Sequence, residues 1–153
     1  WTRDSRFFYY SDLAADEYGL TNVLIQVDMQ DGSLETLYEG SVADQGLSLS
    51  FPVCSPTENM LVVSAQTNLK VPGKRLYALN LDDLSLSMIL DDLSKVPGFY
   101  AWSADGRQVV FQVYTPAAPD QESEIWVWDR ASGETQKLVT GGSAPQWGEE
   151  VDS

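Results

Sequence analysis

An internal repeat restricts the fold of this chain more than any other feature of its sequence. The segment "WSADGRQVVF" from Trp102 has counterparts in "WTRDSRFFYY" from Trp1 and "CSPTENMLVV" from Cys54, and a truncated copy, "WGEEVDS", begins at Trp147. Each complete copy has a Trp or Cys, a polar turn and an apolar strand. The starts at 1, 54, 102 and 147 are 53, 48 and 45 residues apart, and such periods are typical of repeat architectures.

A second module repeats in step with the first. In each copy a strand of alternating pattern is followed by a polar turn and another strand, which is the pattern of a β-hairpin. The first strands end at Asp28, Asn80 and Asp129. Gly32 and Gly133 supply the positive φ that such turns favour, whereas the middle copy has Leu84 at this position. We therefore expect the middle turn to differ.

Each period contains four short strands, which in the third copy are predicted at 98–102, 107–113, 124–128 and 134–139. No segment shows sustained helical periodicity. Four antiparallel strands in a repeat of about 40–50 residues are typical of a β-propeller blade. We predict an all-β chain of three such blades, a partial or half propeller. The alternative is a β-sandwich with chance similarity, which two modules recurring in register disfavour. The expected boundaries are about 1–43 for blade 1, about 44–95 for blade 2, about 96–142 for blade 3, and 143–153 for a strand of a next or partner blade.

Several repeat residues have a structural role in this interpretation. Trp102 ends the innermost strand, where its ring is expected to fill the wedge between neighbouring blades. Ser103 and Asp105 are expected to bond to amides of the following turn, and Gly106 to supply its unusual dihedral angle. The positions assigned to the repeat are Trp1, Cys54, Trp102, Asp105, Gly106, Asp28, Asn80, Asp129 and Trp147.

These residues resemble the TolB-type β-propeller repeat, a relative of WD-repeat blades. Its signature is W-S-P-D-G with a hydrophobic strand, then a strand ending in Asp before a Gly-containing turn. The segments "WSADGRQVVF" and "IWVWDRASGETQKLV" match it, with Ala104 in place of Pro, whereas the first two copies depart further. The resemblance covers nearly the whole chain and implies the propeller fold, which hosts many activities.

The resemblance also carries expectations about relatives and location. The family includes a periplasmic translocation component that binds other envelope proteins, so the resemblance leans towards an extracytoplasmic location. The repeat also resembles the propeller domains that gate prolyl-oligopeptidase-like serine peptidases. Neither set of functional residues has a counterpart in this sequence.

Composition excludes several classes of function. A net charge of −14 argues against binding to nucleic acid or anionic membranes. The sequence has no histidine and one cysteine, Cys54, which removes His-based triads and His-containing or multi-Cys metal sites. The segment "GGSAP" has Pro145 where a nucleophile elbow needs its last glycine. We expect no catalytic residue, no metal and no cofactor.

The long connections between strands are expected on one face of the propeller. They are 12–22, 66–74, 114–124, 39–48 and 91–98. Loops this long in a tight repeat often carry binding residues, the alternative being tolerated insertions. The candidate ligand- or partner-binding residues are Asp12, Asp16, Glu17, Tyr18, Asp44, Asp91, Asp92, Tyr114 and Asp120.

The favoured function is therefore a non-enzymatic binding or scaffold propeller that contacts a protein or ligand through its long-loop face. One alternative is an accessory propeller of a larger enzyme, such as a prolyl-oligopeptidase-like peptidase. Another is a catalytic propeller such as a lyase or glycosidase.

Three blades do not close a ring, which needs about four or more. The first copy lacks most of an innermost strand, whereas "SAPQW" at 143–147 is predicted to be an innermost strand with no blade after it. Two explanations fit: a piece of a longer propeller protein, or a head-to-tail homodimer of six blades.

Overall fold

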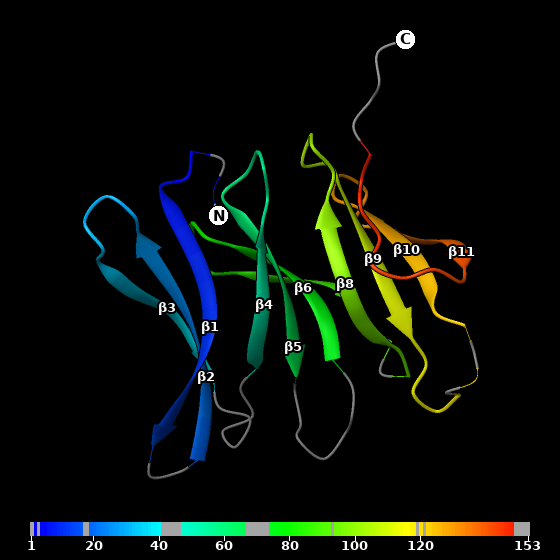
Figure 1. The fold of residues 1–153 in the computed structure, drawn as a ribbon, viewed down its shortest axis with the longest axis horizontal. Helices are drawn as coiled ribbons and strands as arrows, with labels where there is room; N and C mark the ends of the chain where they lie inside the picture. The colour runs from blue at the N-terminus through cyan, green and yellow to red at the C-terminus, as the bar shows by residue number, and fades with distance from the viewer. Residues whose placement is uncertain are drawn as a thin grey trace.

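The chain forms three antiparallel sheets that lie side by side (Figure 1). The computed structural model describes residues 2, 4–16, 19–40, 47–66, 74–92, 94–118, 120 and 122–148, except for the side chains of 14–16 and 19–21. These residues form eleven strands and no helix, and so no helix long and apolar enough to cross a membrane lies among them.

We call the sheets blades 1, 2 and 3. Blade 1 contains β1 (Phe7–Asp16), β2 (Gly19–Asp28) and β3 (Leu34–Gly40). Blade 2 contains β4 (Ser48–Cys54), β5 (Met60–Gln66), β6 (Lys74–Asn80) and β7 (Leu86–Leu90). Blade 3 contains β8 (Val96–Trp102), β9 (Gln108–Tyr114), β10 (Glu124–Asp129) and β11 (Thr135–Thr140). In each sheet the strands neighbour one another in chain order, as hairpin patterns predict.

The connection predicted as a long loop at 12–22 is mostly strand. The β1–β2 ladder continues from Phe7 opposite Asp28 to Asp16 opposite Gly19, so the prediction of a loop was wrong here. Aspartate and glycine are depleted in strands, which hid the extension in the sequence. The ladder forms nevertheless because its hydrogen bonds come from the backbone.

The turn of the middle hairpin does not differ from the other two. Leu84 adopts a φ of +57°, close to the +74° and +72° of the two glycines at this position. The amide of Asn80 donates to Ser85 O at 2.9 Å, the same backbone bond that closes the other turns. Side-chain oxygens of Asn80 and Asp83 accept the amides of Asp82 and Ser85, each at 2.9 Å. These bonds hold leucine in a left-handed conformation, and the expectation of a different turn was wrong.

Apolar side chains fill both junctions between blades. One buried cluster lies between blades 1 and 2, and half-buried Cys54 packs against it, where burial raises the pKa of the thiol. The other cluster lies between blades 2 and 3 and contains Phe111, which is 0% exposed, together with Trp102 and Trp128. The two tryptophan rings meet edge to face, with centroids 6.1 Å apart.

Two repeat tryptophans, Trp102 and Trp147, also bond to the innermost strand one repeat earlier. The indole Nε1 of Trp102 donates to Val53 O at 3.2 Å, and Nε1 of Trp147 donates to Ala101 O at 3.1 Å. Val53 and Ala101 are equivalent, since each precedes the repeat position in its own copy. Trp102 therefore contributes a directed hydrogen bond in addition to packing, and this bond aligns blade 3 with blade 2.

The polar turn after each innermost strand is held by its own side chains. Asp105 Oδ1 accepts Ser103 Oγ at 2.6 Å and the Arg107 amide at 3.1 Å, which lowers the pKa of the Asp105 carboxyl. In blade 1, Asp4 Oδ1 accepts Thr2 Oγ1 at 2.6 Å in the same way. The same turn forms in blade 1 because threonine, like serine, has the hydroxyl that donates to the aspartate.

Replacing Gly106 by alanine should destabilise the fold more than the same change at Gly133. Both glycines have positive φ, +66° and +72°, where alanine costs about 1–2 kcal/mol. A Cβ at Gly106 would also clash with Thr57 Oγ1, whereas nothing lies within 4 Å of a Cβ at Gly133. Urea unfolding of the two variants measures the difference, and equal losses would contradict this account. Adding Thr57→Ala should restore part of the loss in Gly106→Ala only.

The predicted strand at 143–147 is not a strand in the structure. Residues 141–148 carry no strand, because within the described residues no second strand lies beside them to form a ladder. The segment is still anchored on blade 3. Buried Gln112 donates through Nε2 to Gly142 O and accepts the Ala144 amide on Oε1, both at 3.3 Å.

Candidate functional site

Five of the nine predicted binding residues have described side chains: Asp12, Asp91, Asp92, Tyr114 and Asp120. Asp12 accepts the Leu13 amide at 2.8 Å, and Asp91 pairs with Arg75 at 3.3 Å while remaining 68% exposed. Asp92 accepts the amide and hydroxyl of Ser94, which lower the pKa of its carboxyl. Tyr114 and Asp120 are exposed. Glu17, Tyr18, Asp44 and the side chain of Asp16 lie outside the described residues. In the described ranges, no three carboxylate, thiol or imidazole groups lie close enough to hold a metal ion.

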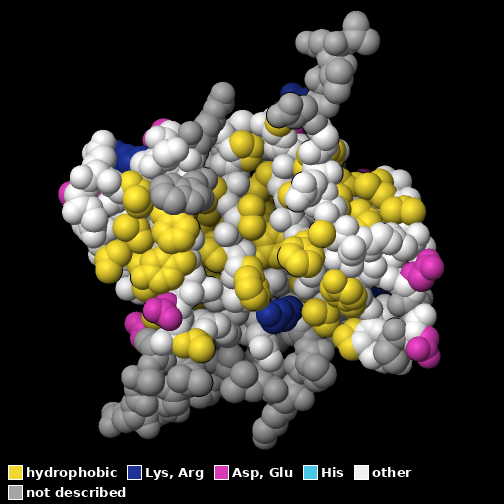
Figure 2. Space-filling model, viewed as in Figure 1, with side chains coloured by type: hydrophobic (Ala, Val, Ile, Leu, Met, Phe, Trp, Pro, Cys, Tyr) yellow, Lys and Arg dark blue, Asp and Glu magenta, His cyan; other side chains and the backbone are white. Residues whose placement is uncertain are grey.

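A concave surface lies between the innermost strands of blades 2 and 3 and forms a groove. We call it the aromatic groove; its volume is about 490 Å³. Figure 2 shows hydrophobic side chains gathered on this face, with a basic group beside them. Its lining residues are Phe51, Pro52, Val53, Ser64, Lys74, Pro97, Gly98, Phe99 and Tyr100.

Two neighbouring β-bulges create the groove. In β4 the ladder shifts between Ser50 and Val53, and in β8 between Pro97 and Tyr100, so that two residues oppose one on the neighbouring strand. Phe51 and Phe99 share one repeat position, although Phe51 is the first of the two opposed residues in its bulge and Phe99 is the second, and each is 65% exposed. Large aromatic side chains are thus turned out of the ladder at two neighbouring places.

The backbone at Phe51 is strained. Its φ is +55°, a conformation in which a bulky L-residue is an outlier. Strain of this kind costs on the order of 1–3 kcal/mol and gathers at functional sites. The ammonium of Lys74 lies 4.8 Å from the centroid of the Phe51 ring, where a cation is attracted to the ring face. Among the described residues that line the groove, Lys74 is the only charged one.

Tyr100 connects β8 and β4, the two strands on either side of the groove. Its hydroxyl donates to the carbonyl oxygen of Phe51. Burial raises the pKa of Tyr100 to about 12, so the hydroxyl keeps its proton, and its role as donor, at neutral pH. The spacing of the two phenylalanines is therefore set by a bond between blades.

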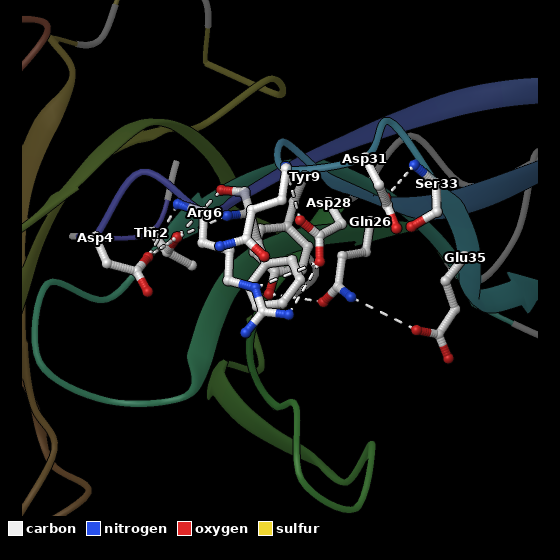
Figure 3. Close-up of polar contacts among 11 residues, drawn as sticks. Thr2, Asp4, Arg6, Tyr9, Gln26, Asp28, Asp31, Ser33 and Glu35 are labelled. Atoms are coloured by element: carbon white, nitrogen blue, oxygen red, sulfur yellow. Dashed lines mark hydrogen bonds and ion pairs between the residues drawn. The ribbon is translucent and has the colours of Figure 1, made fainter.

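Two other polar networks lie outside the groove. In blade 1, Arg6 binds Asp28 through Nε at 3.3 Å and Nη2 at 3.1 Å, and Tyr9 donates to Gln26 at 2.9 Å (Figure 3). In blade 3, Glu124 accepts hydrogen bonds from Lys95, Trp126 and Lys137. In both networks the carboxylates are occupied by partners within the fold, so these networks stabilise the blades.

A second concave surface, of about 670 Å³, lies between the first turns of blades 1 and 2. Its wall includes Asp4 and Glu58. Asp4 is bonded within its own turn, and Glu58 pairs with Arg130 of blade 3 at 3.1 Å. Glu58 stands where blade 3 has Gly106, whose missing Cβ lets its turn close onto Thr57. We attribute this second concave surface to Glu58, which is larger than the glycine at the equivalent turn position of blade 3.

Sequence reasoning missed the residues of the aromatic groove because their types are those of a core. Phe51 and Phe99 stand in apolar strands, which favours burial. The available signal was proline: Pro52 and Pro97 interrupt two equivalent strands, and proline in a strand marks an edge or a bulge.

Comparison with known proteins establishes the fold. The sequence matches no family model, and no curated protein matches it by sequence. Among solved structures, the putative TolB from Agrobacterium tumefaciens is 18% identical with a TM-score of 0.68, over 91% of this chain and 47% of that chain. The fold is a partial β-propeller. The three-blade prediction and the resemblance to TolB-type propellers are thereby confirmed at the level of architecture.

Enzymes also appear among the similar structures. The β-propeller domain of the Trilobed protease from Pyrococcus furiosus is 14% identical, with a TM-score of 0.66 over 88% of this chain and 40% of that chain. An oligogalacturonate lyase in complex with manganese is 16% identical, with a TM-score of 0.62 over 81% and 32%. The chain thus spans a third to a half of the length of the structures it resembles. At these identities the likeness concerns the fold alone.

Proposed function

We propose that the chain is a non-enzymatic binding module that holds an apolar segment of a protein partner in the aromatic groove. The observation that carries this proposal is the pair of equivalent phenylalanines, each 65% exposed, at the bulges of neighbouring inner strands. Exposing both rings to water is unfavourable in free energy, and Phe51 is also held at an unfavourable φ. A partner that covers the rings removes the unfavourable free energy of their exposure.

The chemistry of the lining supports binding rather than turnover. A volume of about 490 Å³ lies in the usual range of ligand pockets, and rigid aromatic residues are common anchors of protein interfaces. The described lining offers aromatic and proline rings, the hydroxyl of Ser64, the hydroxyl of Tyr100 that is bonded to Phe51 O, and one cation in Lys74. These groups favour an aromatic or branched aliphatic side chain as the occupant.

Replacing Phe99 by alanine should weaken this binding at least about tenfold, as expected when an interface anchor is truncated. The probes are fluorescein-labelled Gly/Ser decapeptides with a single central Trp, Leu or Ser, followed by fluorescence anisotropy. We expect the Trp and Leu peptides to bind and the Ser peptide not to bind. Phe51→Ala should act in the same direction.

Met88→Ala is the matched control, since Met88 is a 42% exposed apolar residue on β7 of blade 2, away from the groove lining. Equal binding of all three peptides, or unchanged affinity in Phe99→Ala, would contradict the proposal. Turnover of peptide or oligogalacturonate substrates by the chain would contradict its non-enzymatic part.

A second candidate function is that of an accessory propeller in a larger peptidase. It is favoured by the likeness to the propeller domain of the Trilobed protease, of which the chain covers 40%. The discriminating observation is the coding sequence downstream of Ser153: a G-x-S-x-G segment followed by an Asp and a His would support this candidate.

A further inference from the structure

The outer face of blade 3 exposes apolar groups that are buried in blade 2. Leu138 and Val139 of β11 are 55% and 52% exposed. Their equivalents in β7, Ile89 and Leu90, are 6% and 5% exposed because blade 3 covers them. Among the described residues, blade 3 therefore presents one half of a blade junction without the other half.

Blade 1 presents the opposite half. Phe8 and Tyr10 stack with ring centroids 5.8 Å apart and are half-buried. Their equivalents in blade 2, Leu61 and Val63, are 0% exposed and belong to the cluster packed against blade 1. The sheet of blade 1 has three strands, and its order places β1 at the edge where blades 2 and 3 have their innermost strand.

Residues 143–147 have the features of such an innermost strand. Trp147 makes the interblade bond that Trp102 makes. Ala144, at the position equivalent to Phe51, has a φ of +47° where Phe51 has +55°. The segment thus follows the path of an inner strand beside blade 3, and among the described residues no strand lies beside it to form a ladder.

We propose that two copies of this chain associate head to tail, with residues 143–146 of one copy pairing along β1 of the other. The pairing adds the fourth strand to blade 1, and the outer face of blade 3 covers Phe8 and Tyr10. A two-fold axis repeats the contact and closes six blades. A second copy is the occupant because the two ends are complementary halves of the junction already formed twice within the chain.

The repeat fixes the register of this contact. Ser143 is equivalent to Ser50, and Ser11 is equivalent to Ser64; Ser50 lies opposite Ser64 in blade 2. Ser143 of one copy is therefore expected opposite Ser11 of the other. Trp1 and Trp147 share one repeat position, so the new ladder is expected to end at Gln146.

Light scattering behind a sizing column tests the association, from about 1 to about 100 µM. About 0.5 M salt screens the repulsion between copies that each carry −14. We expect a species at twice the 16.9 kDa of one chain. Deletion of 143–153, or Val139→Lys, should leave a monomer, whereas Met88→Lys on β7 should not. A monomer at every concentration, or a dimer that survives both changes, overturns the proposal.

A cysteine pair tests the register without relying on destabilising variants. Ser11→Cys and Ser143→Cys, in a Cys54→Ala background, should form a disulfide-linked dimer on mild oxidation. The pair Ser11→Cys and Ser132→Cys is the control, since Ser132 is an exposed residue of the β10–β11 turn. Equal cross-linking of the two pairs, or none in the first, overturns the proposed pairing.

Discussion

Replacing Trp102 by alanine should lower the free energy of unfolding by about 3–5 kcal/mol, the usual loss for a buried aromatic residue. Trp102 is 8% exposed, packs on Trp128, and donates the interblade bond to Val53 O. Removing it leaves a cavity at the junction of blades 2 and 3 and an acceptor without its partner. Urea unfolding followed by far-UV circular dichroism measures the loss.

Trp147→Ala is the matched control for this experiment. Trp147 makes the same type of bond, to Ala101 O at 3.1 Å, but it is 39% exposed. Its replacement should cost much less, because less apolar surface returns to water. If both variants lose the same stability, the bond rather than the packing is the main contribution, and our account of Trp102 is wrong.

Acid should destabilise the fold through Glu124. Lys95 Nζ donates to its Oε2 at 2.5 Å, Trp126 Nε1 donates to Oε2 at 2.9 Å, and Lys137 Nζ donates to Oε1 at 3.2 Å. The Glu124 side chain is 11% exposed. These donors, Lys95 first, lower the pKa of Glu124 from 4.5 to about 2.

The sign of the effect follows from linkage. A carboxyl whose pKa is lower in the folded state stabilises the fold above its unfolded pKa, and this stability is lost as pH falls from about 4.5 to about 2. The turn carboxylates share the direction of this shift: Asp4, Asp31, Asp83, Asp92, Asp105 and Asp129. Denaturant unfolding at a series of pH values should therefore show stability falling through this window.

The variant Glu124→Gln distinguishes the contribution of Glu124 to the pH dependence of stability from that of the other carboxylates. At pH 7 the variant should lose about 1.5–3 kcal/mol, the usual loss for hydrogen bonds to a charged group. Between pH 4.5 and 2 it should lose less further stability than the wild type. Glu134→Gln, an exposed residue of the same blade, should leave both quantities unchanged. An identical pH profile for wild type and Glu124→Gln would contradict the assignment.

The repeat made the architecture predictable, because it places the same residue types at the same structural positions. The Ser103–Asp105 turn and the hairpin turn after Asp129 form from local hydrogen bonds that the sequence contains within a few residues. The number of blades could therefore be predicted from the number of such turns. The conformation of the turn at Leu84 was predicted wrongly, because the prediction relied on the preference of glycine for positive φ. Hydrogen bonds to the side chains of Asn80 and Asp83 hold the turn in the same conformation without glycine.

The aromatic groove was not predictable in the same way. Whether Phe51 points into the core or out of it depends on a bulge, since a register shift of one residue reverses the face of a side chain. The ion pairs of Glu124 join β10 to Lys95, a residue far away in the sequence, and no local pattern encodes that distance. The acidic loop residues that were predicted instead are suited to turns, and Asp92 is used in this way.

The interblade tryptophan bond has a consequence for how such a chain can change over time. Each indole donates to a carbonyl one repeat earlier, from Trp102 to Val53 O and from Trp147 to Ala101 O, and the acceptor is a backbone atom that any residue supplies. As far as this bond is concerned, a repeat unit inserted or deleted at this boundary keeps a backbone acceptor in the adjoining unit. Gene duplication can then lengthen or shorten the array in whole units without a matching substitution at the acceptor position.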